Sequence, residues 1–303
     1  MLEMLLLTGQ AVASGPHALF AGGLHNTTLY SSVEKYYYPS AAVQSATVLN
    51  AAQQAWAGMG NDTQAVFAAG LSAQASTTYT AATQKYLHAS DTVEAGTALS
   101  QARSWPSASS NDTTGYVSGG ANGTQVVNTY THATDAVALG TALAVQRIDS
   151  AGMGNAIYAM VMGGYPTGGG TTPVASTERF TYSNGTRVNG SDLGVAKRTA
   201  CGTGTPIYGI VAMGYSGSAY LSGSDKYTYS NHTRVAATSL TVAYYRAGAA
   251  GNGTEGIFAG GGTAQIGQAN TSRYVFAGDA VTAGTALIER RQGLAAASSL
   301  NVI

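Results

Sequence analysis

The chain contains 303 residues, of which 45% are apolar and only 9% are charged, whereas charged residues make up about 25% of an average soluble domain. Its 14 basic and 14 acidic residues cancel, and no window holds a run of like charges, which argues against nucleic acid and anionic membrane as partners. The single Cys201 excludes an internal disulfide and supplies no pair of metal ligands.

The N-terminal segment superficially resembles a secretory signal, with an apolar run from Leu5 to Leu7 followed by Ala11-Val12-Ala13. Glu3 stands where such a signal carries positive charge, and the apolar run is too short, so we do not expect cleavage. No apolar stretch approaches the roughly 18 residues of a membrane span, and we expect no membrane insertion.

An aromatic residue then returns along the chain at steps of 44 to 50 residues, and a leucine follows each one 13 residues later. A period of 40 to 50 residues indicates one supersecondary unit copied around an array. We expect a single domain over 1–303 with repeats at about 10–52, 53–102, 103–146, 147–196, 197–244 and 245–290. The recurring aromatic residues are Tyr36, Tyr86, Tyr130, Phe180, Tyr227 and Tyr274.

The fourth repeat shows the organisation of one unit most clearly. A segment of small residues follows Arg147, and after the turn at Gly154-Asn155 a continuous apolar run over 157–162 ends at Gly163-Gly164. Residues 177–182 then alternate between two faces, as in a half-exposed strand. The Asn-Gly turn at 184–185 leads into an outer strand that ends at Leu193. We therefore expect four strands per repeat.

Four antiparallel strands with a long loop between the second and third form one blade of a β-propeller. The sequence thus predicts an all-β, six-bladed propeller. A helical solenoid is the rival architecture, but 40 glycines and the near absence of a 3.6-residue apolar period would leave its helices unstable.

Nine Asn-x-Ser/Thr sequences occur, several of them at expected turns. Asn is favoured where a turn needs a positive φ, so we interpret them as turn residues. Glycosylation of a secreted protein is the alternative interpretation.

The Gly163-Gly164 pair followed by Glu178-Arg179-Phe180 resembles the kelch repeat, and the resemblance covers nearly the whole chain. The tryptophan common in the fourth kelch strand is absent, and Gly-Gly is replaced by Ala69-Gly70 and Met213-Gly214. In its low charge and its heavy usage of Ser, Thr, Gly and Ala, the sequence resembles the kelch-like propellers of bacteriophage tails and related bacterial surface proteins.

The two termini carry one inner-strand segment too many for six blades, because Gln10 to Ser14 match Arg291 to Ser298. In one alternative residues 291–303 close the ring while the N-terminus is displaced. In the other the surplus copy pairs with a neighbouring subunit. We expect one terminus to serve assembly.

The sequence offers few candidates for catalysis. His88 and His132 stand where other repeats have an aromatic residue, which indicates packing, and we interpret Cys201 as a small buried thiol rather than part of a copper site. Glu34, Glu178 and Asp225 recur at one strand position, which favours a structural role over a glycosidase pair. We expect no cofactor, no metal site and no catalytic residues.

Five arginines recur near the inner strands. If they converge on the central channel, they are suited to an anionic sugar, as the resemblance to sialate-modifying kelch enzymes implies. Alternatively, each one ties its blade to the next through backbone carbonyls. They are Arg103, Arg147, Arg198, Arg246 and Arg291.

The loops between second and third strands break the repeat, since their lengths differ. They carry tyrosines among small polar residues, a combination suited to stacking on sugar rings or docking a protein; alternatively, these tyrosines cap hydrophobic edges. We take them as the candidate binding residues: Tyr30, Tyr79, Tyr165, Tyr215 and Tyr220.

From these observations we expect a non-enzymatic structural or receptor-binding module of an extracellular particle, such as a bacteriophage tail. Its partners are then host-surface glycan or neighbouring virion proteins, with a homo-oligomer as a further option. A sialate-epimerase-like carbohydrate enzyme and a secreted glycan-binding lectin are the alternatives.

Overall fold

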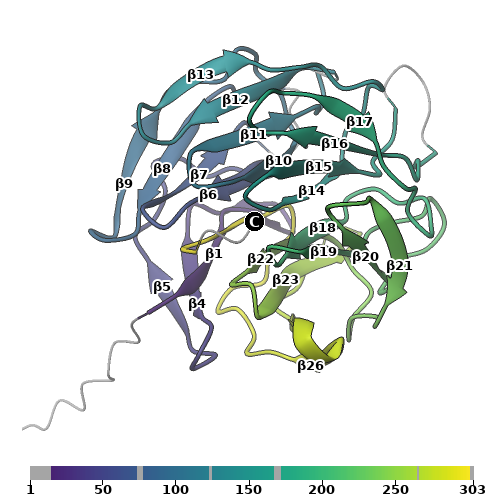
Figure 1. Cartoon of the computed structure of the whole chain (residues 1–303). Coiled ribbons are helices and arrows are strands. Elements are labelled where there is room, and N and C mark those ends of the chain that lie inside the picture. The colour runs from purple at the N-terminus through teal and green to yellow at the C-terminus, as the bar shows by residue number, and fades with distance from the viewer. Residues whose placement is uncertain (1–14, 74–77, 123–124, 167–171, 265, 301–303) are drawn as a thin grey trace, which may run out of the picture.

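A computed structural model of the chain describes residues 15–73, 78–122, 125–166, 172–264 and 266–300. Almost all regular structure in these ranges is β-strand, and the helix among them is the three-residue 3-10 turn η1 (Phe276–Gly278). No helix in the described part is therefore long and apolar enough to cross a membrane. Six antiparallel sheets surround a central axis (Figure 1), so the predicted six-bladed β-propeller is confirmed.

The first three blades each hold four strands, which follow one another from the axis outward. Blade I consists of β27 (Ala295–Ser298), β1 (His17–Ala21), β4 (Val33–Tyr37) and β5 (Val43–Ala46), with a small hairpin of β2 (Leu24–His25) and β3 (Thr28–Leu29). Blade II consists of β6 (Ala57–Gly60), β7 (Gln64–Ala68), β8 (Thr83–Leu87) and β9 (Thr92–Gly96). Blade III consists of β10 (Ser107–Ser110), β11 (Thr114–Ser118), β12 (Val127–Thr131) and β13 (Ala136–Leu139).

The other three blades repeat this order. Blade IV consists of β14 (Ala151–Gly154), β15 (Tyr158–Met162), β16 (Thr177–Thr181) and β17 (Arg187–Asn189). Blade V consists of β18 (Cys201–Gly204), β19 (Tyr208–Ala212), β20 (Ser224–Thr228) and β21 (Thr233–Ala237). Blade VI consists of β22 (Tyr245–Gly251), β23 (Glu255–Thr263), β25 (Thr271–Val275) and β26 (Ala280–Ala283), and the short β24 (Ile266–Gly267) pairs with β23.

The outer strand of blade IV ends earlier than the sequence predicts. It stops at Asn189, and Leu193 lies beyond it in the linker to the next blade, where it is buried. The apolar side chain reaches the cluster between blades IV and V, and a chain that turns inward to make this contact leaves the sheet edge.

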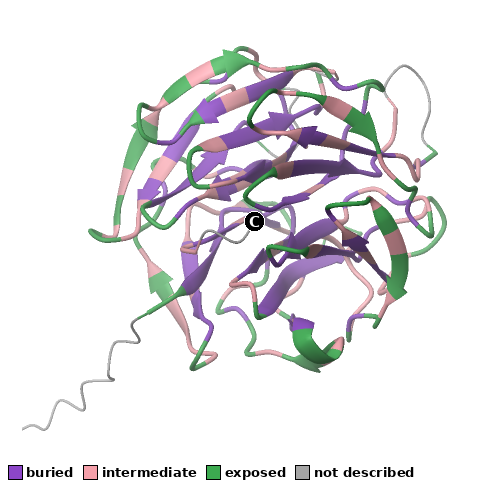
Figure 2. Ribbon diagram, in the orientation of Figure 1, coloured by how far each residue is buried: buried purple, intermediate pink, exposed green. Residues whose placement is uncertain are grey.

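The core consists of separate apolar clusters between neighbouring blades. The recurring aromatic residue of each third strand is fully buried, and the leucine after each fourth strand is 2% to 5% exposed. In the cluster between blades I and II, Leu19 and Val33 pack with Phe67 and Tyr86. Buried inner strands and exposed outer strands follow from this arrangement (Figure 2). Blade packing therefore explains the period of the sequence.

Each second strand has two residues with positive φ at or near its end. Gly163 and Gly164 have φ values of 63° and 86°, and a Cβ on Gly164 would lie 2.5 Å from the carbonyl oxygen of Ile148. Ala69 and Met213 adopt the same conformation with φ values of 64° and 61°. Left-handed backbone is strained for non-glycine residues, so the fold imposes this turn even where its preferred residue is missing.

The C-terminal segment supplies the innermost strand of the first blade. β27 pairs with β1 in antiparallel register, with Ala18 opposite Ser298 and Ala21 opposite Ala295. Blade I is thus built from both ends of the described chain, as in the first of the two alternatives predicted for the C-terminal segment. The matching N-terminal copy, Gln10 to Ser14, lies outside the described residues, so the repeat expected at about 10–52 takes its inner strand from 295–298.

Candidate ligand-binding site

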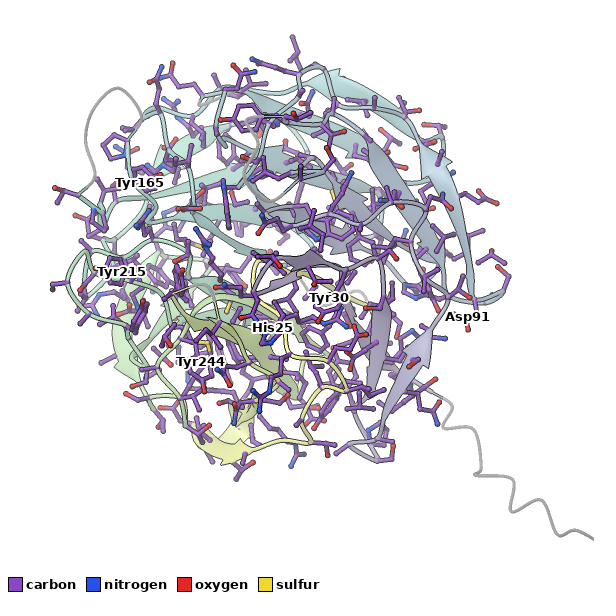
Figure 3. The ribbon with its side chains drawn as sticks, turned by 180° about the vertical axis from the view of Figure 1, so that it is seen from behind. His25, Tyr30, Asp91, Tyr165, Tyr215 and Tyr244 are labelled. Atoms are coloured by element: carbon purple, nitrogen blue, oxygen red, sulfur yellow. The ribbon has the colours of Figure 1, made fainter. Side chains whose placement is uncertain are left out.

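The loops between second and third strands share one face of the ring with the linkers that lead into the blades. We call this the loop face. Single β-bridges join a linker residue to a loop residue there, as between Ile148 and Tyr165 and between Arg198 and Tyr215. Figure 3 labels Tyr30, Tyr165 and Tyr215 on the molecule, with Tyr165 and Tyr215 near one another and Tyr30 apart from them.

A closed circle of backbone hydrogen bonds surrounds the axis on this face. One residue of each linker donates its N–H to the carbonyl oxygen of its counterpart in the preceding blade, at 2.6 to 3.1 Å. All six residues have φ between 52° and 64°. We call them the mouth ring, which in order from blade II to blade I comprises Ala55, Trp105, Asp149, Thr199, Arg246 and Gly293.

Two side chains of the mouth ring meet across the axis. Trp105 lies just before the inner strand of blade III, and Arg246 lies at the start of the inner strand of blade VI. Blades III and VI are opposite each other in a ring of six. The Cζ atom of Arg246 lies 4.3 Å from the centroid of the Trp105 ring. This cation–π contact therefore joins opposite blades over the end of the channel.

The contact is one end of a continuous series of aromatic and guanidinium groups. Successive members lie 4.3 to 5.5 Å apart, measured between ring centroids or from Cζ to centroid. We call the series the aromatic–arginine arc. It runs through Tyr165, Arg198, Tyr215, Tyr220, Tyr245, Arg246 and Trp105.

Backbone hydrogen bonds hold the tyrosine hydroxyl groups of the arc. Tyr220 Oη accepts from the N–H of Ala264 at 2.9 Å, and Tyr245 Oη donates to the carbonyl oxygen of the same residue. Tyr215 Oη donates to Gly217 O at 2.8 Å. Because the rings are anchored and still partly exposed, they offer contact surface with little side-chain entropy left to lose on binding.

Asp149 lies beside the arc and is only 6% exposed. Its Oδ2 is 3.4 Å from Nη1 of Arg198, while its Oδ1 is buried without a hydrogen-bond partner among the described residues. Burial raises the pKa of this carboxyl to about 6, against the opposing effect of Arg246 and Arg198. A buried carboxylate with a perturbed pKa beside a cavity is typical of a functional site.

A small cavity opens among these residues, and we call it the mouth cavity. It measures about 80 Å³ and is lined by Trp105, Asp149, Thr199 and Arg246 together with apolar neighbours such as Trp56. Its walls therefore combine an indole, a guanidinium and a carboxylate.

The structure separates the five arginines predicted as one set. Arg103, Arg147 and Arg291 each follow the recurring leucine by four residues and are fully buried. Arg198 and Arg246 follow it by five and six residues and are partly exposed on the loop face. Counting from the leucine would have distinguished the two groups in the sequence.

The three buried arginines join a linker to the blade that it enters, rather than one blade to the next. Arg147 Nη1 donates to the carbonyl oxygens of Gly163 and Ser176 at 3.1 and 2.9 Å, and Nη2 lies 2.8 Å from Glu178 Oε1. Arg291 makes the corresponding contacts with blade I, including Glu34 Oε1 at 2.6 Å. These carboxylates are thereby engaged in structural ion pairs.

The five predicted loop tyrosines are likewise divided. Tyr165, Tyr215 and Tyr220 belong to the arc, whereas Tyr30 lies over the buried Arg291, with 5.4 Å from Cζ to the ring centroid. Tyr79 forms a β-bridge with Leu71 in the loop of blade II. Sequence reasoning missed Trp105 and Asp149, which stand in linkers, and Tyr245, which begins the inner strand β22, because none of them lies in a loop between second and third strands.

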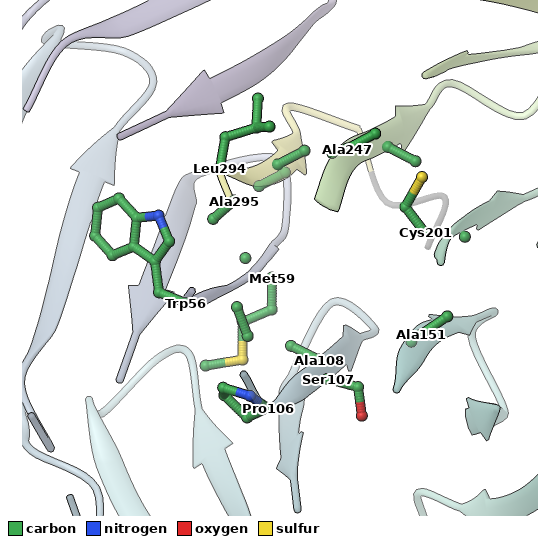
Figure 4. A pocket seen from close by; sticks show the side chains of 18 of the residues that line it. Trp56, Met59, Pro106, Ser107, Ala108, Ala151, Cys201, Ala247, Leu294 and Ala295 are labelled. Carbon is green, nitrogen blue, oxygen red and sulfur yellow. The ribbon is translucent and has the colours of Figure 1, made fainter. Parts of the chain in front are cut away.

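Small side chains line the channel beyond the mouth. Its cavity of about 100 Å³ is bordered by inner-strand residues such as Gly58, Ala108 and Gly202, with Leu300 also in its wall (Figure 4). Burial raises the pKa of the Cys201 thiol in this wall to about 12, which leaves it protonated near neutral pH and unsuited to nucleophilic chemistry. No group of three or more His, Cys, Asp or Glu residues in the described ranges has metal-binding geometry.

Fold and loop face together define a six-bladed β-propeller with an aromatic and arginine-rich mouth. No model of a known protein family matches the sequence, and neither does any curated protein.

Proposed function

We propose that this protein is a non-enzymatic binding module whose loop face recognises a host-surface glycan. The observation that carries the proposal is the aromatic–arginine arc, in which three of the five tyrosines selected from the sequence lie in one series with two arginines. The inner end of the arc, Arg246 and Trp105, lines the mouth cavity. Aromatic faces stack on the apolar faces of sugar rings, and guanidinium groups donate hydrogen bonds to their oxygens.

A binding role accounts for the site better than the enzyme alternative does. Arg103, Arg147 and Arg291 are fully buried and bonded to their own blades, so a channel of five arginines is not available for an anionic substrate. Simultaneous mutation of Arg147 and Arg198, which would test such an enzyme, would also remove a buried ion pair and confound turnover with folding.

The kind of particle to which this module belongs is proposed from the sequence. The resemblance to kelch-like propellers of bacteriophage tails, together with the low charge and the Ser, Thr and Gly-rich composition, supports a virion component that contacts the host surface. A secreted lectin would use the same face in the same way. Neighbouring virion proteins are the other partners that this setting offers.

The test is binding to a glycan array by the wild type, by Tyr165→Ala and by Tyr215→Ala. Each variant loses stacking surface, and we expect a loss of affinity of about tenfold, equivalent to about 1.4 kcal/mol. Tyr79→Ala is the matched control, because it removes a partly exposed loop tyrosine outside the arc. Thermal unfolding of all variants separates loss of binding from loss of fold.

Two results would contradict the proposal. One is an array that shows no glycan bound by the wild type. The other is an equal loss of binding in Tyr79→Ala, which would place recognition outside the arc. Turnover of a bound glycan by the wild type would instead favour the enzyme alternative.

A further inference from the structure

We propose that the mouth cavity holds one neutral sugar unit, whose adjacent hydroxyl groups bond to Asp149 Oδ1 and to the guanidinium of Arg246. This inference rests on the proposed glycan-binding function and names the subsite and the ligand class. The cavity lies where the mouth ring, the Trp105 indole and the inner end of the arc meet.

The two polar groups at this place have unused hydrogen-bonding capacity. Asp149 is more than nine-tenths buried, and its Oδ1 accepts no hydrogen bond within the described structure. Arg246 contacts the rings of Trp105 and Tyr245 through its guanidinium face, and its buried Nε has no partner there either. An unpaired buried carboxylate oxygen is costly, so a ligand donor that reaches it gains binding energy.

The charges favour a neutral ligand with both donors and acceptors. Arg198 Nη1 lies 3.4 Å from Asp149 Oδ2, so these two side chains form an ion pair, and the guanidinium of Arg246 is the other charge that borders the cavity. A ligand carboxylate would bring a second negative charge next to this buried one, which is unfavourable. A pair of adjacent hydroxyl groups donates to Asp149 and accepts from Arg246 without adding charge.

The dimensions of the cavity limit the ligand to one unit. A single water needs about 10 to 15 Å³ of such volume, so about 80 Å³ accommodates the hydroxyl edge of one sugar but not an oligosaccharide. The next units of a glycan would then extend over the arc towards Tyr215 and Tyr165.

Binding should also disturb the contact between Arg246 and Trp105. Trp105, Asp149 and Arg246 line the same cavity, so a ligand that bonds to Asp149 and Arg246 there also changes the surroundings of the indole. The indole therefore reports on occupancy. The chain contains two tryptophans; Trp56 also borders the cavity and packs against Phe67, so the variant Trp105→Phe is needed to assign the signal to the indole that contacts Arg246.

The experiment titrates the intact protein with methyl glycosides of glucose, galactose and mannose, and with the methyl glycosides of the matching hexuronic acids. Tryptophan fluorescence and saturation-transfer NMR are recorded. We expect a saturable fluorescence change with at least one neutral glycoside, at least tenfold weaker binding of its hexuronic acid, and loss of the fluorescence change in Trp105→Phe.

Variants separate this subsite from the wider glycan site. Asp149→Asn should weaken the monosaccharide at least tenfold, whereas Tyr79→Ala, again the control outside the arc, should leave it unchanged. No saturable binding of any neutral glycoside by NMR, or tighter binding of the hexuronic acid, would overturn the inference. Array binding that persists in Asp149→Asn would overturn this subsite alone and leave the proposed function standing.

Discussion

Histidine replaces an aromatic residue after the third strand in blades II and III. Tyr38, Tyr229 and Phe276 hold this position in other blades and are almost fully buried. His132 is 7% exposed and stacks edge-on against Tyr130 at 5.6 Å between ring centroids. The packing role predicted for these histidines agrees with this geometry, and it places imidazoles where only the neutral form is well accommodated.

Stability should therefore fall on acidification. Burial lowers the pKa of His88 and of His132 to about 4, and the neighbouring His17 and Lys35 add to the effect at His88. The unfolded chain binds protons near the ordinary value of 6.5, so between pH 6.5 and 4 each histidine lowers the free energy of unfolding by up to about 1.4 kcal/mol per pH unit. Urea unfolding midpoints from pH 7 to 4.5 measure this.

The double variant His88→Phe with His132→Phe removes the titrating groups while it keeps an aromatic side chain, as at Phe276. We expect a shallower pH dependence over the same range. Tyr229→Phe, at the corresponding position of blade V, is the control and should keep the wild-type slope, because it removes no imidazole. Equal slopes in the wild type and the double variant would show that other groups govern the acid sensitivity.

The residue scale also marks a limit of sequence reasoning. Recurrence selected five arginines, but only the register against the leucine distinguishes the buried Arg147 from Arg198 and Arg246, which reach the loop face. A shift of one residue along the linker changes the direction in which the side chain points. Because the linker is irregular, its sequence has no periodic pattern that predicts this direction.

At the scale of the element, the inner strands show why small residues recur around the axis. A Cβ built on Gly152 of β14 would lie 2.0 Å from the carbonyl oxygen of Ala108 in β10. Gly58 of β6 stands in the same relation to Ala296 of β27, at 2.2 Å. Backbone contact between neighbouring inner strands thus requires small residues such as those that follow Arg147 in the sequence.

Gly152→Ala should consequently destabilise the propeller by about 1 to 3 kcal/mol, because the added methyl group overpacks a site walled by backbone. Chemical unfolding gives the difference. Gly223→Ala is the matched control, since a Cβ there meets no atom within 4 Å, and its effect should stay within about 0.5 kcal/mol. A tolerated Gly152→Ala would mean that the inner strands can move apart.

The residue at one position of the third strand and its partner in the preceding linker differ from blade to blade, but they remain a matched pair. Glu178 faces Arg147 and Asp225 faces Lys197, the latter pair 3.2 Å apart, while in blade III Asn128 accepts a hydrogen bond from Arg103. The sequence revealed the recurring acid but not its partner, because the two stand about 30 residues apart and the partner lies in an irregular segment.

At the scale of the whole molecule, ring closure depends on the C-terminal strand. β27 completes blade I, and its Ala295 and Ala297 join the cluster between blades I and II. Arg291 fixes the preceding linker to Ser32 and Glu34. Loss of this segment would leave β1 as an unpaired edge next to the channel.

A chain that ends at residue 290 should therefore lose cooperative unfolding and aggregate. Circular dichroism and light scattering record this, and a synthetic peptide of residues 291–300 should restore the fold by strand addition. A truncated chain that stays folded and monomeric would contradict closure within one chain and would favour the alternative in which the segment pairs with a neighbouring subunit.

Blade number and strand order followed from the sequence because they are local and repeated six times. Contacts across the axis did not follow. Trp105 and Arg246 belong to opposite blades and meet only because the ring has closed, and burial at this mouth raises the pKa of Asp149. The mouth cavity is thus a property of the assembled circle that no single repeat encodes.

In the mouth ring every residue donates its N–H to its counterpart in the preceding blade, so the circle of hydrogen bonds has no beginning or end. Gly293 receives the hydrogen bond of Ala55 and gives its own to Arg246 just as every other member does. His17 and Ser299, close to the two ends of the described chain, are hydrogen-bonded to each other. Because the circle has no first member, we expect that joining these ends while opening a turn such as that at Gly253 would yield the same circle from a permuted gene.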